Sequence, residues 1–176
     1  PATHLEWWPG VQTQLLRFFS HHLKGADTVR SSKRTQFWNI TQSRWQEACT
    51  SLAMTWSLHS EGLACTDPTH GVLQSESSGM GMEWIVHDPW RPMPAIGGHL
   101  SPSAGPADRA SLDRRTDVAT FNTLPLRGEL QLFGRPQLSI RAQADQPGFA
   151  LCVSLSRCAA GGSTAEQLST GFLRVL

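Results

Sequence analysis

Residues 11–23 carry the clearest alternation of apolar and polar positions in the chain. The apolar side chains recur at the three- and four-residue spacing that gathers them on one face of a helix. Pro9 and Gly10 precede this pattern, and Lys24-Gly25 follows it with a basic last turn and a glycine suited to a left-handed cap. The sequence therefore predicts a short amphipathic helix, with a face formed by Val11, Leu15, Phe18, Phe19, His22 and Leu23.

After Gly25 the spacing changes to that of β-strands. Short segments rich in aromatic, leucine and β-branched residues are separated by Gly, Pro, Asp and Ser. In one of them Leu138 and Ile140 alternate with polar residues, as expected of a strand with one buried face. Their spacing predicts a mostly β fold, an antiparallel sandwich or jelly roll preceded by the short helix. The predicted strands are residues 35–40, 53–59, 71–74, 82–87, 117–123, 129–133, 137–142, 149–156 and 171–176.

Two connections between these strands stand out. Residues 96–115 form a long irregular loop, which we expect to lie over a sheet face. Residues 159–163 are rich in glycine and predict a small hairpin loop.

Composition and charge exclude several classes of function. The net charge of +1 and pI of about 8.2 give no field of one sign, so we expect no nucleic-acid partner. No apolar run approaches the roughly 18–20 residues that span a bilayer, and no secretory leader pattern opens the chain. We therefore expect no membrane partner and a cytoplasmic location. The chain begins with Pro1, which indicates a processed product or an expressed fragment.

The four cysteines lack the paired spacing of a metal site. Cys49, Cys65, Cys152 and Cys158 contain no Cys-x-x-Cys unit, so we expect free thiols and no bound metal.

Three blocks of sequence carry a family resemblance. The first is THLEWWPG followed by a predicted helix that ends in FFSHHLKG. The second, within residues 84–111, is HDPWRPMPAIGGHL, and the third is DRRTDVATFNTLPLRGELQLFGRPQLSIRAQADQPGFALCVSL. The first resembles the end of the catalytic domain of the CocE/NonD hydrolases, and the others resemble their C-terminal β domain. This family includes cocaine-esterase-like enzymes and X-Pro dipeptidyl-peptidases, and the blocks cover most of the chain.

The resemblance implies two domains. Residues 1–25 would be the C-terminal end of an α/β-hydrolase catalytic domain, and residues 26–176 a jelly-roll, galactose-binding-like β-sandwich. The family's β domain continues past the LSTGFLRV strand, so we expect the sandwich to be incomplete at its C-terminus, with open edges. The partners implied are an upstream α/β-hydrolase domain and a small ester or peptide substrate, with no cofactor.

The same resemblance implies His4 as the histidine of a Ser-Asp-His triad. An imidazole on an exposed loop can take the serine proton and later return it to the leaving group. In α/β-hydrolases the serine and the acid precede the histidine, and no Gly-x-Ser-x-Gly elbow occurs in this chain. We therefore expect both partners upstream of His4, and no activity from this chain alone.

Three tryptophans are candidates for substrate binding. In the family the β domain packs on the catalytic domain and helps to form the wall of the cleft, so Trp45, Trp84 and Trp90 are candidates for an acyl pocket. Ordinary core packing is the favoured alternative for the same residues.

Two further groups of polar residues favour structural roles. His87, Asp88 and His99 could be a metal set or a triad, but the flanking prolines favour a turn in which Asp88 accepts backbone amides. The charged run 108–117 predicts a salt-bridged, solvated surface loop. The alternative for that run is an anion site formed by Arg109, Arg114 and Arg115.

A different class of function stays open. The chain could be a free-standing jelly-roll module that binds carbohydrate or protein. A helix preceded by a loop histidine has no purpose in such a module, which favours the hydrolase interpretation. A structural role in a homo-oligomer is compatible with either.

Overall fold

The computed structural model of the chain describes residues 10–25, 35–39, 41–47, 53–76, 81–98 and 105–176. The chain divides into two compact units, unit 1 (Pro1–Ala53) and unit 2 (Met54–Leu176). The predicted domain boundary after residue 25 stays a prediction, and His4 lies outside the described residues.

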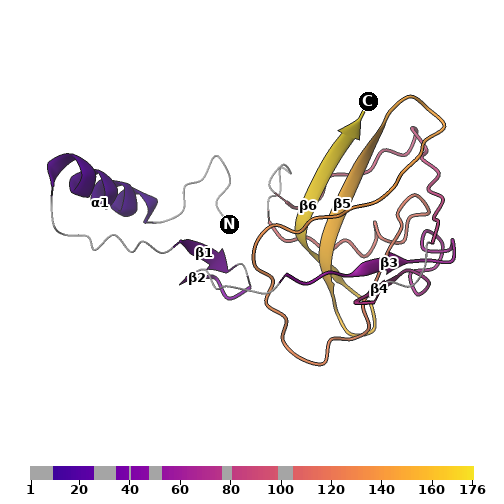
Figure 1. The fold of residues 1–176 in the computed structure, drawn as a ribbon, viewed down its shortest axis with the longest axis horizontal. Helices are drawn as coiled ribbons and strands as arrows, with labels where there is room; N and C mark the ends of the chain where they lie inside the picture. The colour runs from indigo at the N-terminus through magenta and orange to yellow at the C-terminus, as the bar shows by residue number, and fades with distance from the viewer. Residues whose placement is uncertain (1–9, 26–34, 40, 48–52, 77–80, 99–104) are drawn as a thin grey trace. The chain divides into compact units, whose positions relative to one another are not determined.

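Unit 1 begins with the predicted helix. Helix α1 spans Val11–Lys24, as the helical spacing indicated (Figure 1). Gly25 adopts the left-handed conformation, with φ of 61°, and its backbone N–H donates to the carbonyl of Ser20. The helix and its glycine cap are therefore confirmed. None of the helix residues is buried, and Leu16 and Leu23 are among its most exposed apolar side chains.

Unit 1 also contains a short antiparallel hairpin. Strand β1 (Gln36–Asn39) confirms the strand predicted at 35–40, and it pairs with β2 (Arg44–Glu47), which the sequence did not predict. The side chain of Asn39 accepts the backbone N–H of Gln42 at 2.8 Å and so caps the turn.

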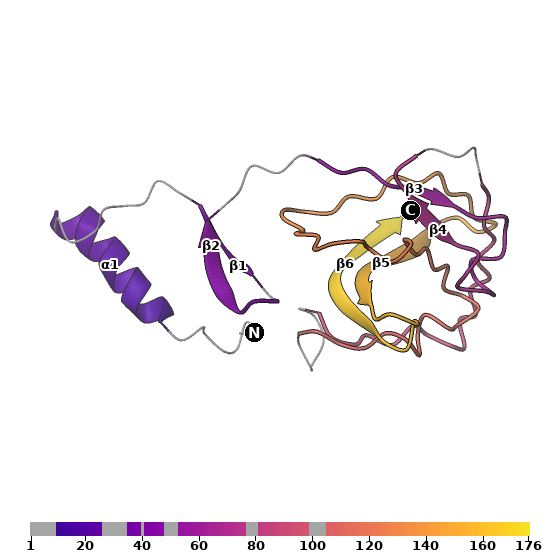
Figure 2. The same cartoon turned by 90° about the horizontal axis from the view of Figure 1, so that it is seen from below.

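Unit 2 contains two further antiparallel hairpins. Strand β3 (Ser57–His59) pairs with β4 (Val72–Gln74), and β5 (Phe149–Cys158) pairs with β6 (Ala165–Val175). In Figure 1 the long β5–β6 hairpin runs at a steep angle to β3–β4, and Figure 2 shows that it is curved along its length. A register shift between Leu155 and Ser156 marks a bulge, which is a usual cause of such bending.

The interior of unit 2 is small and mixed in polarity. Residues 120–122 hydrogen-bond to β4 and to the preceding Gly71, and residues 107–109 hydrogen-bond to β6. Irregular segments thus extend the two hairpins and enclose the core between them. The buried residues are Ala64, Cys65, Ala110, Leu112 and Ala165, together with Ser60, Arg109 and Gln167.

The mostly β, antiparallel class is confirmed. The described strands form three two-stranded sheets, and the predicted glycine-rich loop connects β5 to β6. The strand expected at 171–176 begins earlier, at Ala165, and residues 117–123 contribute a single parallel bridge from Asn122 to Val72.

Three predicted strands are wrong in the described part of the chain. Residues 82–87, 129–133 and 137–142 belong to no strand there. A strand requires a hydrogen-bonded neighbour as well as an alternating pattern. Leu138 and Ile140, the apolar positions of the third segment, are exposed, so the alternation that predicted it has no covering layer.

Candidate functional site

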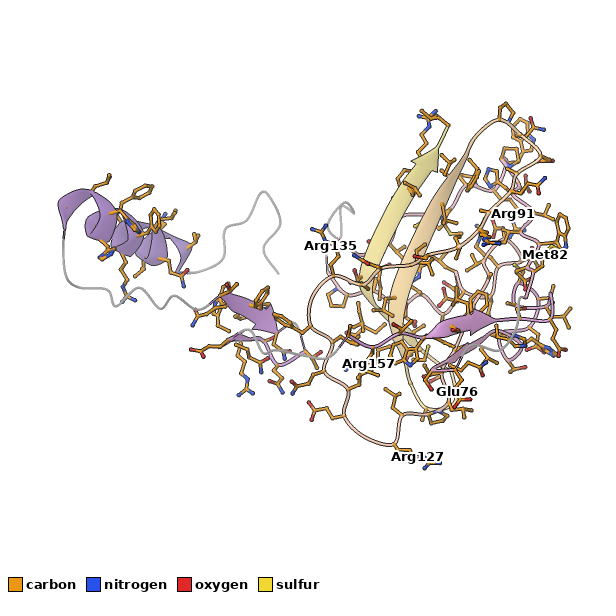
Figure 3. All side chains as sticks on the ribbon, in the orientation of Figure 1. Glu76, Met82, Arg91, Arg127, Arg135 and Arg157 are labelled. Carbon is orange, nitrogen blue, oxygen red and sulfur yellow. The ribbon has the colours of Figure 1, made fainter. Side chains whose placement is uncertain are left out.

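Unit 2 carries an exposed apolar segment, residues 82–93, called here the apolar strip. Trp84 is 73% exposed and Trp90 is 91% exposed, so core packing is wrong for both. Met82 and Arg91 mark positions near its two ends in Figure 3. A group of large apolar side chains in contact with water is a feature of binding surfaces. Its exposed apolar members are Met82, Trp84, Ile85, Val86, Trp90 and Met93.

Glu83 holds the first end of the apolar strip against the body of unit 2. Its carboxylate accepts the hydroxyl of Ser60 at 2.6 Å and the backbone N–H groups of Ala64 at 3.0 Å and Cys65 at 3.3 Å. Partial burial alone would raise the pKa of Glu83, but these donors outweigh it and hold the pKa below its usual value. Glu83 is therefore an ionised anchor next to Trp84.

Asp88 organises the turn that carries Trp90. The Asp88 carboxylate accepts the backbone N–H of Trp90 at 2.9 Å, and its carbonyl accepts the N–H of Arg91 at 3.0 Å. The predicted structural role of Asp88 is confirmed. Among the described residues, no three His, Cys, Asp or Glu side chains are grouped to hold a metal, and His99 lies outside that part of the chain.

Arg115 holds the other end of the apolar strip. Its Nε and Nη2 donate to the two carboxylate oxygens of Asp117 at 2.7 and 2.5 Å, and Nη2 also donates to the carbonyl of Arg91 at 2.6 Å. Both side chains of this pair are largely withdrawn from solvent. The hydrogen bonds from Arg115 lower the pKa of Asp117. The two-pronged pair is geometrically specific, since an arginine fork matches a carboxylate.

Arg109 enters the interior of unit 2. It is 8% exposed, and its Nη1 donates to the side-chain oxygen of Gln167, itself 4% exposed, at 3.0 Å. Its Nε lies 3.5 Å from a carboxylate oxygen of Asp113, a contact too long for a good hydrogen bond. Burial raises the pKa of Asp113, and the charge of Arg109 opposes that shift.

The prediction for the charged run 108–117 was therefore partly wrong. The expected salt bridges are present, but Arg109 and Arg115 are not solvated. The alternative anion site is also disfavoured, because Arg115 binds the Asp117 carboxylate and the charge of Arg109 lies beside that of Asp113.

The remaining candidates fall in unit 1. Trp45 is 42% exposed, and its ring meets that of Trp38, its cross-strand partner, at 5.6 Å and an interplanar angle of 72°. Such edge-to-face pairs stabilise a two-stranded ladder. The candidates are thus divided, with Trp45 in unit 1 and Trp84 and Trp90 in unit 2.

The predicted free thiols are confirmed for the three described cysteines, Cys65, Cys152 and Cys158. Burial and the neighbouring Glu83 carboxylate raise the pKa of Cys65 to about 11. A thiol with so high a pKa is a poor nucleophile near neutral pH.

Sequence reasoning missed Glu83 and Ser60. The only signal for Glu83 was a single acid within the apolar run Met82–Val86, and nothing in the sequence indicated that Ser60 would be its partner.

Comparisons with known proteins agree on one family context. The sequence family of the X-Pro dipeptidyl-peptidase C-terminal non-catalytic domain matches residues 8–176. Two curated proteins named as candidate serine esterases, from Mycobacterium bovis and Mycobacterium tuberculosis, are each 26% identical to the chain over 132 residues. The match covers 69% of this chain and 19% of each relative, so the chain spans about a fifth of their length. No solved structure matches significantly. No helix in the described ranges is long and apolar enough to cross a membrane.

Proposed function

The chain belongs to the family of X-Pro dipeptidyl-peptidase C-terminal non-catalytic domains, and from this premise we propose that it serves as the accessory β domain of a serine hydrolase. The complete enzyme would transfer acyl groups from small esters or X-Pro peptides to water. This part would contribute no nucleophile, and it would bind an upstream α/β-hydrolase domain of the same polypeptide.

The observation that carries this proposal is the apolar strip. Trp84 and Trp90 are exposed near the two ends of the strip. Hydrogen bonds of Glu83 hold the end next to Trp84, and a hydrogen bond from Arg115 holds the end next to Trp90. An aromatic surface fixed in this way supplies contact area at little cost in conformational entropy. We propose that it packs beside the catalytic cleft, where the indoles contact the acyl group of the substrate. Trp45 is proposed as a further wall residue.

The proposed chemistry divides between this chain and the rest of the enzyme. His4 would accept the proton of an upstream serine as that serine attacks the carbonyl, and return it to the leaving group. An upstream aspartate would hold the other ring nitrogen of His4. The division is supported by the domain match and by the lack of a nucleophile elbow in this sequence.

The test uses the full-length protein and p-nitrophenyl esters as probes. We expect His4→Ala to lower kcat by about a thousandfold or more, as loss of a triad member does. Trp84→Ala and Trp90→Ala should raise KM for p-nitrophenyl butyrate. Leu124→Ala, which removes an equally exposed apolar side chain outside the strip, is the matched control and should leave KM unchanged. Full turnover by the His4→Ala enzyme would refute the triad assignment.

The alternative function is that of a free-standing carbohydrate-binding module. Measuring the binding of soluble glycans to this chain distinguishes it from the accessory domain of a hydrolase. Such a module would bind a panel of soluble glycans through Trp84 and Trp90 without any upstream domain. Homo-oligomer formation through the β domain is compatible with the hydrolase proposal, and sedimentation of the full-length protein tests it.

A further inference from the structure

We propose that Glu83 and Arg115 are positioning residues, which act on substrate binding by fixing the apolar strip at its two ends. The inference rests on the proposed function, because it assumes that Trp84 and Trp90 contact the substrate. It adds two residues that touch no substrate themselves and that act through the indoles.

The hydrogen bonds of Glu83 to Ser60, Ala64 and Cys65, called here the first tether, require a close approach of the strip to Ser60. A side chain at Gly81 would place its Cβ only 2.5 Å from the carbonyl oxygen of Ser60, so glycine is needed for the strip to approach this closely. The Ser60 hydroxyl then donates to Glu83 and also accepts the backbone N–H of Gly62 at 3.1 Å. The carboxylate is therefore bound by groups that are themselves held in place.

The exposure pattern links Glu83 to Trp84. Met82 and Trp84 are exposed, as are Ile85 and Val86, whereas Glu83 between the first two is half-buried and bonded to the body of unit 2. Trp84 follows Glu83 directly in the chain, so the hydrogen bonds that fix Glu83 also restrict the backbone that carries Trp84. Fixing Glu83 therefore limits the positions that the Trp84 indole can take.

The hydrogen bond from Arg115 to the carbonyl of Arg91, called here the second tether, acts on the turn that carries Trp90. Arg115 donates to the carbonyl of Arg91 at 2.6 Å, and its two hydrogen bonds to Asp117 fix the orientation of the guanidinium. Between the two tethers, the hydrogen bonds of the described residues are local to the Asp88 turn. The position of the indoles thus depends on the two ends.

A purely structural role would look different in the assay. A residue that only stabilises the fold lowers the amount of active enzyme and leaves the KM of the folded fraction alone. A positioning residue changes KM, and the change requires the side chain that it positions.

The experiment is a double-mutant cycle in the full-length enzyme. Glu83→Gln keeps the volume of the side chain, but it replaces one accepting carboxylate oxygen with an NH2 group and removes the negative charge. We expect it to raise KM for p-nitrophenyl butyrate about fivefold, with kcat changed less than about twofold, since a misplaced wall weakens binding. In the Trp84→Ala background the same substitution should change KM less than about 1.5-fold. Arg115→Lys in the presence and absence of Trp90→Ala repeats the test at the other end.

The control is Glu129→Gln, which removes an exposed carboxylate outside the strip and should leave both constants unchanged. If Glu83→Gln does not yield folded enzyme, Ser60→Ala removes one donor to the carboxylate and should raise KM in the same direction by a smaller factor.

The outcomes separate the inference from the proposed function. If Trp84→Ala and Trp90→Ala leave KM unchanged, the proposed cleft role fails and the inference falls with it. If those variants raise KM but Glu83→Gln has no effect, or has its full effect without Trp84, the cleft role stands and the positioning role is refuted.

Discussion

Gly71, immediately before β4, offers a sharp test of how unit 2 is assembled. Its carbonyl accepts the backbone N–H of Asn122 at 2.9 Å, which joins residues 120–122 to β4. A Cβ added at Gly71 would lie 1.7 Å from the carbonyl oxygen of Thr120 and 3.1 Å from the Cβ of Ala64. The substitution Gly71→Ala therefore introduces a clash with backbone on one side and with a core side chain on the other.

The magnitude follows from how far the chain must move. Backbone atoms would have to separate by more than about 1 Å, which stretches a 2.9 Å hydrogen bond beyond any useful length. Overpacking of this kind costs about 1–3 kcal/mol, and each lost backbone hydrogen bond adds about 1 kcal/mol. We expect Gly71→Ala to lower the free energy of unfolding by about 2–4 kcal/mol.

Urea denaturation of the full chain, followed by circular dichroism, measures this change. Gly171→Ala is the matched control, because Gly171 lies within β6 with nothing within 4 Å of an added Cβ. We expect that control to be neutral or to stabilise by up to about 1 kcal/mol, since alanine restricts the unfolded chain. Equal stability of the two variants would show that residues 120–122 do not pack against Gly71, and the assembly described here would be wrong.

Two further predictions concern the interior of unit 2. Gln167→Leu removes the hydrogen-bond partner of Arg109 Nη1 and of the Ile96 carbonyl. It should lower the free energy of unfolding, measured by urea denaturation, by about 2–4 kcal/mol. The control Gln137→Leu, on the exposed surface, should lower it little. If both substitutions cost the same, the buried contact is not formed. The raised pKa of Cys65, about 11 against 9.0, should slow its alkylation at pH 8 about a hundredfold relative to the urea-unfolded chain. Mass spectrometry of the labelled peptides measures the rate at Cys65, and exposed Cys152 should react before buried Cys65 in the native chain.

The elements predicted correctly are those whose signal is local. The helix at Val11–Lys24 follows from its own spacing and glycine cap, and β5 follows from alternation along a ten-residue strand. Strand β2 was missed because its sequence, Arg-Trp-Gln-Glu, is mostly polar and its formation depends on pairing with β1. Residues 137–142 show the opposite error, since their alternation is strong but no neighbouring strand pairs with them.

The candidate site was predicted in part, and the reason is again the range of the interaction. The sequence drew attention to Trp84 and Trp90 but could not decide between core and surface, which depends on what covers them. Glu83 binds a residue 23 positions earlier, and Arg115 binds the carbonyl of one 24 positions earlier. Such pairings are set by the tertiary fold, so neither composition nor spacing reveals them.

The bulge in the β5–β6 hairpin has a consequence for which side of the ribbon each residue serves. Leu173 pairs with Leu151 on one side of the bulge, whereas Gln167 pairs with Ser156 on the other, and Leu168 is the additional residue between them. Paired residues share a face and side chains alternate, so the extra residue places Gln167 on the face of the hairpin opposite to that of Leu173. In the first half of β6 this places Gln167 in the interior, bonded to Arg109, whereas residues 171–175 in the second half are exposed.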